Sequence, residues 1–191
     1  MSIQKEHLKV TEASLDEEAV LLQSQSDSQA FRPLYEKYYK RLFLFLLHRT
    51  GEKEIAADLC QQVFLKALTR IGKFQFRGLP FSAWLYRIAI NECNDFFRKT
   101  KRARMVTLDD DSVNTLFEEM TADSTLEDLH RELPLILQKL KAEELQLIEL
   151  RFFEGRPFKE ISDILQISEN YAKVKTYRAL DRMKQLFLGK K

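Results

Sequence analysis

The sequence has few of the residues that break helices and form turns. Five Gly and four Pro are spread over 191 residues, of which 45% are apolar and 31% charged. A chain of this size and composition can bury one or two small cores. Its abundant Leu, Lys and Glu favour long helices. We therefore predict an all-α protein and exclude both a chain disordered throughout and a turn-rich sheet fold.

Long apolar runs and closely spaced cysteines are also missing. The longest apolar run, Leu42–Leu47, is far shorter than the roughly 20 residues of a transmembrane helix. The polar start of the chain is no signal peptide. Cys60 and Cys93 are too few and too isolated for a disulfide framework or a zinc site. We expect a cytoplasmic protein with no membrane insertion, no metal, no cofactor and two cysteines that serve packing.

Catalytic motifs are absent as well. His7, His48 and His130 are scattered, and the sequence contains no glycine-rich phosphate loop. No nucleophile lies in a motif with a matched base. The sequence therefore argues against an enzyme.

Basic residues are missing from one long internal segment. The net charge is only +2, but Arg98–Arg104 contains five basic residues, whereas Met105–His130 contains none and has eight acids. A basic block followed by an acidic, poorly periodic stretch is typical of a domain end and a solvated linker. We predict two small helical domains, 15–104 and 124–188, joined by an acidic flexible linker at 105–123.

The N-terminal domain has helical periodicity throughout. Apolar residues recur every three or four positions up to Gly51, which should end one helix, and again over about 54–70, where Gly72 should end the next. Pro80 then precedes a helix over about 81–104. This pattern predicts a helical bundle.

The C-terminal domain contains a helix-turn-helix pattern. Phe158–Leu165 predicts a short first helix, Gln166–Ile167 the turn, and Ser168 the cap of a second helix that reaches about Phe187. One stripe of the second helix must be buried, and it consists of Ala172, Thr176, Ala179, Leu180, Met183 and Phe187.

The opposite face of this second helix has the composition of a DNA-recognition surface. A recognition helix enters the major groove with its N-terminal half, where basic groups meet guanine edges or phosphates and apolar groups touch thymine methyls. Exposed Val174 and Tyr177 are not needed on a merely solvated face. We predict duplex-DNA contacts from Asn170, Lys173, Val174, Lys175, Tyr177 and Arg178.

Several strings of residues resemble a known family. Residues 58–67, DLCQQVFLKA, and 81–91, FSAWLYRIAIN, resemble region two of extracytoplasmic-function (ECF) sigma factors in the sigma-70 family. Residues 150–155, LRFFEG, 158–161, FKEI, and 167–175, ISENYAKVK, look like region four. The resemblance covers about 15–104 and 125–187. It implies a transcription initiation factor that gives RNA polymerase its promoter specificity.

The resemblance also implies contacts with core RNA polymerase. The helix that carries Asp58, Gln61, Gln62 and Leu65 would bind the clamp helices of the largest subunit, and the flap would be a second polymerase contact. Gln62 stands where the family commonly has Glu. One charge-assisted contact would thereby become an ordinary hydrogen bond.

Promoter recognition would be divided between the two domains. By the resemblance, the helix-turn-helix reads the minus-35 element, and the N-terminal domain melts the minus-10 element and binds its single strand. Aromatic, amide and charged side chains suit unstacked bases and phosphates. The candidates are Phe74, Phe76, Arg77, Asn91, Asn94, Asp95, Arg98 and Arg102. Phe74 and Phe76 are equally compatible with a place in the core.

Two further expectations concern partners and alternatives. The resemblance implies control by an anti-sigma factor that clasps both domains. A dimeric helix-turn-helix repressor is the main alternative, because the C-terminal half alone would support it. It leaves the N-terminal strings unexplained. A helical adaptor that binds only protein is a third hypothesis.

Overall fold

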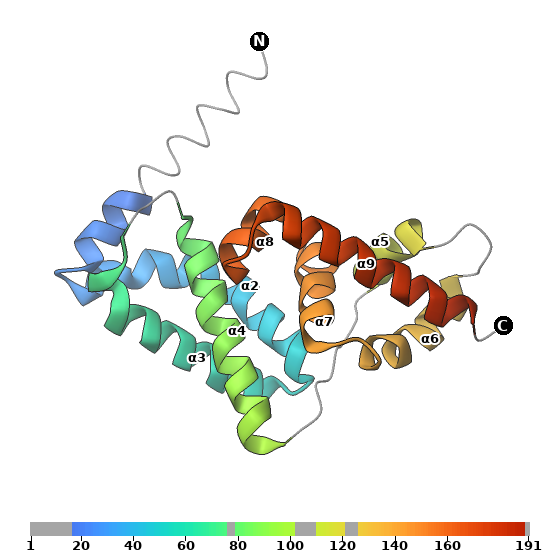
Figure 1. Cartoon of the computed structure of the whole chain (residues 1–191). Coiled ribbons are helices and arrows are strands. Elements are labelled where there is room, and N and C mark those ends of the chain that lie inside the picture. Colours follow the sequence, from blue (N-terminus) through green and yellow to red (C-terminus); the bar gives the residue numbers. More distant parts are fainter. Residues whose placement is uncertain (1–16, 76–78, 102–109, 121–125, 190–191) are drawn as a thin grey trace, which may run out of the picture.

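A computed structural model of the chain describes residues 17–75, 79–101, 110–120 and 126–189. All regular elements in these ranges are helices, which confirms the all-α fold (Figure 1). A helical segment at 17–24 precedes η1 (Ser28–Phe31), α2 (Arg32–Thr50), α3 (Lys53–Arg70), η2 (Ile71–Lys73) and α4 (Phe81–Thr100). The C-terminal half contains α5 (Asp110–Met120), α6 (Leu126–Gln138), α7 (Ala142–Ile148), the π-helical turn η3 (Glu149–Phe153), α8 (Phe158–Leu165) and α9 (Glu169–Leu188). None of the described helices combines the length and apolar character needed to span a membrane.

Glycine and proline set several helix ends. Gly51 ends α2 with a left-handed φ of 70° and donates its N–H to the Leu47 carbonyl, a conformation that costs glycine little. Pro80 directly precedes α4, as predicted. α3 ends at Arg70, so Gly72 lies within η2 and is not itself the end of the helix.

Aromatic rings fill much of the N-terminal core. Phe81 is fully buried and meets Phe31 and Phe74 edge-on, at ring-centroid distances of 6.2 and 5.8 Å. Trp84 is half-buried, and its ring lies 5.0 Å from that of Phe74. Because only 8% of Phe74 is exposed, the core alternative holds for this residue. Its ring is not open to a stacked base in this structure.

The prediction of a flexible linker is wrong for residues 110–120, because they form α5. Val113, Leu116 and Met120 are buried in a core shared with α6, α7, η3 and α9. These three residues are spaced three and four positions apart, so they form a narrow apolar stripe on a helix within an otherwise acidic stretch. The rest of the expected linker, 105–109 and 121–123, lies outside the described residues.

The packing of α5 leads to a stability prediction. Leu116 is completely buried, so Leu116→Ala should lower the free energy of unfolding by about 2–5 kcal/mol. Asn114→Ala, at an exposed position of the same helix, should cost less than about 0.5 kcal/mol. Urea unfolding followed by circular dichroism measures both. Equal midpoints for the two variants would show that α5 contributes nothing to the fold.

The two halves of the chain also pack against each other. α8 lies against α4 (Figure 1). The buried cluster of the N-terminal half continues into Leu147, Leu150, Ile161, Ile164 and Ala172 of the C-terminal half. A second cluster lies farther along the C-terminal half, between α5, α6, α7, η3 and α9. α7, η3 and α9 therefore contribute to both cores.

Both cysteines are buried, and neither forms a disulfide. Burial raises the pKa of the Cys60 thiol to about 12, so its reactive thiolate is scarce at neutral pH. We expect iodoacetamide at pH 7 to leave Cys60 and Cys93 of the folded chain unmodified and to alkylate both in denaturant. Intact-mass spectrometry reads the outcome. Rapid modification of the folded chain would contradict this packing.

Candidate functional site

α8 and α9 form the predicted helix-turn-helix. Gln166 ends α8 with a left-handed φ of 57°. Ser168 caps α9, and its hydroxyl accepts the Tyr171 N–H at 3.2 Å. The whole predicted stripe of α9 is buried, comprising Ala172, Thr176, Ala179, Leu180, Met183 and Phe187. Burial of this stripe fixes which residues of α9 face outward.

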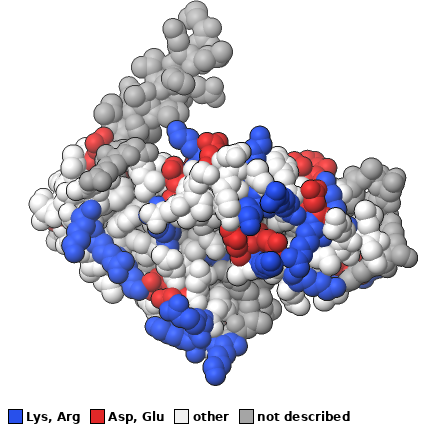
Figure 2. Space-filling model, viewed as in Figure 1, with Lys and Arg blue, Asp and Glu red and all other residues white. Residues whose placement is uncertain are grey.

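The outward face of α9 gathers the predicted DNA-binding residues. Asn170, Lys173 and Arg178 are exposed. Val174 and Tyr177 lie among these polar residues and expose 40% and 41% of their surface, respectively. Figure 2 shows Lys and Arg side chains clustered over α9. The surface can therefore offer hydrogen-bond donors, positive charge and apolar contact to one ligand.

Lys175 differs from the rest of this set. It is half-buried, and its ammonium group lies 5.2 Å from the centre of the Tyr171 ring. Tyr171 in turn donates its hydroxyl to Glu143 of α7 at 2.9 Å. Lys175 thus lies at the edge of the exposed face, beside the tyrosine that bonds α9 to α7.

α3 presents the predicted polymerase-binding residues on one side. Asp58, Gln61, Gln62 and Leu65 are all exposed, whereas Val63 is buried. Positions three and four residues apart lie together on a helix. Leu65 exposes 63% of its surface, so an apolar side chain is available beside these polar groups. The face therefore combines a carboxylate and amides with an apolar anchor.

A groove of about 630 Å³ lies beside this face, between η1, α2 and α3. Its lining includes Arg32, Tyr35, Gln61, Phe64, Leu65 and Leu68. Tyr35 is 39% exposed. A tyrosine combines an apolar ring with a polar hydroxyl, which suits the rim of such a groove. An apolar groove flanked by polar groups fits an amphipathic helix.

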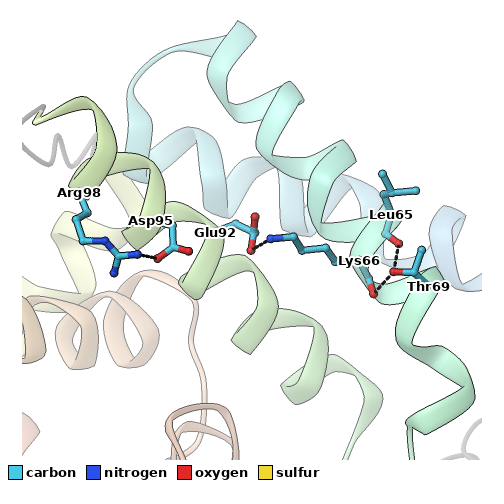
Figure 3. A network of polar contacts seen from close by, with 6 residues as sticks. All are labelled: Leu65, Lys66, Thr69, Glu92, Asp95 and Arg98. Carbon is cyan, nitrogen blue, oxygen red and sulfur yellow. Dashed lines mark hydrogen bonds and ion pairs between the residues drawn. The ribbon is translucent and has the colours of Figure 1, made fainter.

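α4 carries the predicted single-strand face. Asn91 and Arg98 are exposed, and Arg98 pairs with Asp95 at 2.9 Å (Figure 3). Glu92 reaches Lys66 and ties α4 to α3 (Figure 3). An exposed ion pair contributes little stability. Arg98 can therefore leave Asp95 for a phosphate at small cost.

Asn94 lies apart from the exposed members of this face. It is half-buried and lines a cavity of about 650 Å³ together with Phe97, Gln146 and Leu165. Asn94 thus faces the C-terminal half of the chain. The other predicted members, Phe76, Arg77 and Arg102, lie outside the described residues.

Comparison with known proteins identifies both halves of the chain. The model of Sigma-70 region 2 matches residues 34–103, and that of Sigma-70, region 4 matches residues 136–185. The chain is 31% identical over 161 residues to the ECF RNA polymerase sigma factor BldN of Streptomyces coelicolor, covering 84% of this chain but 61% of that relative. It is 28% identical over 155 residues to the ECF sigma factor SigM of Bacillus subtilis, covering 81% of this chain and 93% of SigM.

Solved structures share the fold. CnrH, in complex with the cytosolic domain of CnrY, superposes with a TM-score of 0.60 at 19% identity, covering 91% of this chain and 97% of CnrH. The sigma factor RpoE, in complex with the anti-sigma factor NepR from Bartonella quintana, gives 0.57 at 21% identity, covering 83% of this chain and 96% of RpoE. The two region matches occur in the order that the sequence motifs predicted. The protein therefore belongs to the sigma-70 family, in its ECF group, whose members are transcription initiation factors and not enzymes.

Proposed function

We propose that this protein is an alternative sigma factor that binds core RNA polymerase in the cytoplasm and directs it to a specific set of promoters. The exposed face of α9 is the observation that carries this proposal. It sets Lys173 and Arg178 beside Val174 and Tyr177, over a stripe that is entirely buried.

In this proposal α9 reads the minus-35 element as duplex DNA. Asn170, Lys173 and Val174 lie in the first turns of the helix, which is the part of a recognition helix that reaches base edges. Tyr177 and Arg178 follow one turn later and approach the backbone or the next bases. Lys175 adds charge at the edge of the face.

The α3 face binds the polymerase. Asp58, Gln61 and Gln62 supply polar contacts to the clamp helices of the largest subunit, and Leu65 supplies an apolar anchor. The groove beside Tyr35 and Leu68 extends this surface for a helical partner. Region four contacts the polymerase flap.

The α4 face opens and holds the minus-10 element. Asn91 and Arg98 are exposed and ready for bases and phosphates, and Asp95 is released when Arg98 turns to DNA. Asn94 joins them once the C-terminal half no longer covers it. Phe76, Arg77 and Arg102 complete the proposed set, whereas the ring of Phe74 is buried.

An anti-sigma factor is a further proposed partner. CnrH and RpoE were solved with the cytosolic domain of CnrY and with the anti-sigma factor NepR, respectively. Exposed apolar side chains such as Leu65 and Tyr35 offer a similar partner an anchoring surface here.

A mobility-shift experiment tests the proposal against the repressor alternative, which the comparisons do not support. With a promoter fragment selected from random DNA by the holoenzyme, we expect a shift only when core polymerase is present. A repressor would bind the duplex tightly as a free dimer. A specific shift by the chain alone, unchanged by core polymerase, would therefore overturn the proposed function.

A further inference from the structure

Asp181 is an acidic residue on the face of α9 that carries the predicted DNA-binding residues. It lies seven positions after Val174 (181 − 174), which is close to two helical turns, so both side chains are on the same side of the helix. Both are exposed. Thr176, Ala179 and Met183 lie on the opposite side and are buried. Asp181 therefore faces any duplex that this side of α9 approaches.

Asp181 differs from the acidic residues that hold α9 in place. Glu143 of α7 accepts a hydrogen bond from the Tyr171 hydroxyl of α9 at 2.9 Å. Glu144 of α7 pairs with Arg182 of α9 at 3.2 Å. Asp181 itself makes no ion pair within the part of the chain that the structure describes. Its negative charge is therefore available to act on whatever meets the outward face.

The basic residues of α9 allow two ways of meeting duplex DNA. α9 contains 20 residues and is about 30 Å long, whereas the major groove is about 12 Å wide. In one pose the helix enters the groove tip-first, and only its first turns reach base edges. In the other pose the helix lies flat, and Lys173, Arg178 and Lys184 all meet phosphates. Asp181 lies midway between Arg178 and Lys184 in the sequence, so the flat pose would press it against the same backbone.

The flat pose is the one that needs no particular base sequence. Non-specific binding comes almost entirely from basic residues that neutralise phosphates. A carboxylate among these phosphates removes part of that gain, because like charges repel within the screening length of about 10 Å at about 0.1 M salt. In the tip-first pose Asp181 lies about 10 Å farther along the helix than Val174, and the inclination of α9 carries it away from the groove. The repulsion therefore acts mainly on the flat pose.

We propose that Asp181 is a specificity-determining residue, which disfavours flat binding of α9 to duplex DNA of any sequence and so favours tip-first reading of the minus-35 bases. This role rests on the proposed function of α9. Specificity is a difference between two affinities, and a repulsive group that acts on the unwanted mode increases that difference. The basic residues then attract DNA without holding the polymerase at arbitrary sequences.

Two duplexes measure this role in the complete holoenzyme. One contains a promoter selected from random DNA by the wild-type holoenzyme, and the other differs only by a scrambled minus-35 element. All other contacts are shared, so the ratio of the two affinities reports on α9. At about 0.1 M salt, Asp181→Asn should bind the scrambled duplex about four- to tenfold more tightly, which is the effect of roughly one phosphate contact, and the selected duplex less than about twofold more tightly. The ratio should therefore fall at least about twofold.

Two variants separate the charge of Asp181 from its side-chain size and from the net charge of the chain. Asp181→Glu keeps the negative charge, so its ratio should match that of the wild type. Glu118→Gln removes one negative charge from an exposed position of α5, a helix that packs against the buried side of α9. Its ratio should also match the wild type, because the duplex approaches the other side. Higher salt should shrink the effect of Asp181→Asn, since it shortens the screening length.

The same two duplexes distinguish a failure of this role from a failure of the proposed function. An unchanged ratio in Asp181→Asn, or an equal fall in Glu118→Gln, would overturn the role of Asp181. Lys173→Ala combined with Arg178→Ala tests the reading of minus-35 itself. If this double variant loses the preference for the selected element while Asp181→Asn keeps it fully, the proposed function stands without the role of Asp181. If the preference survives in the double variant, α9 does not read minus-35, and both proposals fail.

Discussion

Replacing Lys173 and Arg178 together by alanine is expected to reduce promoter-directed transcription at least about thirtyfold. Each basic contact to a guanine edge or a phosphate is worth about 1–3 kcal/mol, which corresponds to roughly 5- to 150-fold in binding. Both side chains are exposed, so their truncation should leave folding intact. In-vitro transcription with core polymerase, on a promoter selected by the holoenzyme, measures the loss.

Arg131→Ala combined with Lys139→Ala is the matched control. It removes the same positive charge from exposed positions on and just after α6. Transcription by this control should stay within about twofold of the wild type, because distant surface charges are screened at physiological salt. Equal losses in the two double variants would show that only net charge matters and would remove the base-reading role of α9.

Phe81→Ala is expected to lower the free energy of unfolding of region two by about 3–5 kcal/mol. The ring is fully buried at the start of α4 and meets Phe31, Phe74, Tyr38 and Trp84. Truncation would leave a cavity in the centre of this cluster. The urea midpoint, followed by tryptophan fluorescence of the neighbouring Trp84, should fall by more than about 1 M.

Phe81→Leu separates lost volume from lost aromatic contacts. It restores most of the packing and should cost clearly less than Phe81→Ala. Asn91→Ala, at an exposed position of the same helix, should leave the midpoint nearly unchanged. A midpoint for Phe81→Ala that matches Asn91→Ala would contradict the central position of this ring.

The sequence predicted α9 well because its pattern is local and complete. Six apolar or small residues lie on one stripe, mostly three or four positions apart, and Ser168 marks the start of the helix. The same six residues are buried in the structure. Periodicity of this kind depends on one helix only. The α3 set, in contrast, was implied by the family resemblance, and its members Asp58 and Leu65 are both exposed.

The features that the sequence did not predict depend on contacts between distant residues or on a weak pattern. α5 has only a narrow stripe, Val113, Leu116 and Met120, within a stretch whose acidic residues indicated a linker. Phe74 is buried because its ring packs against Phe81 and Trp84, which follow in the next helix. The pairing of Arg49 with Glu149 joins residues 100 positions apart (149 − 49), and no local pattern indicates such a partner.

Co-elution of the purified chain with sigma-free core RNA polymerase tests the central claim most directly. The wild type should elute with the polymerase, and the variant Asp58→Ala, Gln61→Ala should bind at least about tenfold more weakly. Asp181→Ala combined with Gln185→Ala removes the same chemical groups from exposed positions of α9 and should bind like the wild type. Failure of the folded wild type to bind core polymerase at all would contradict the account.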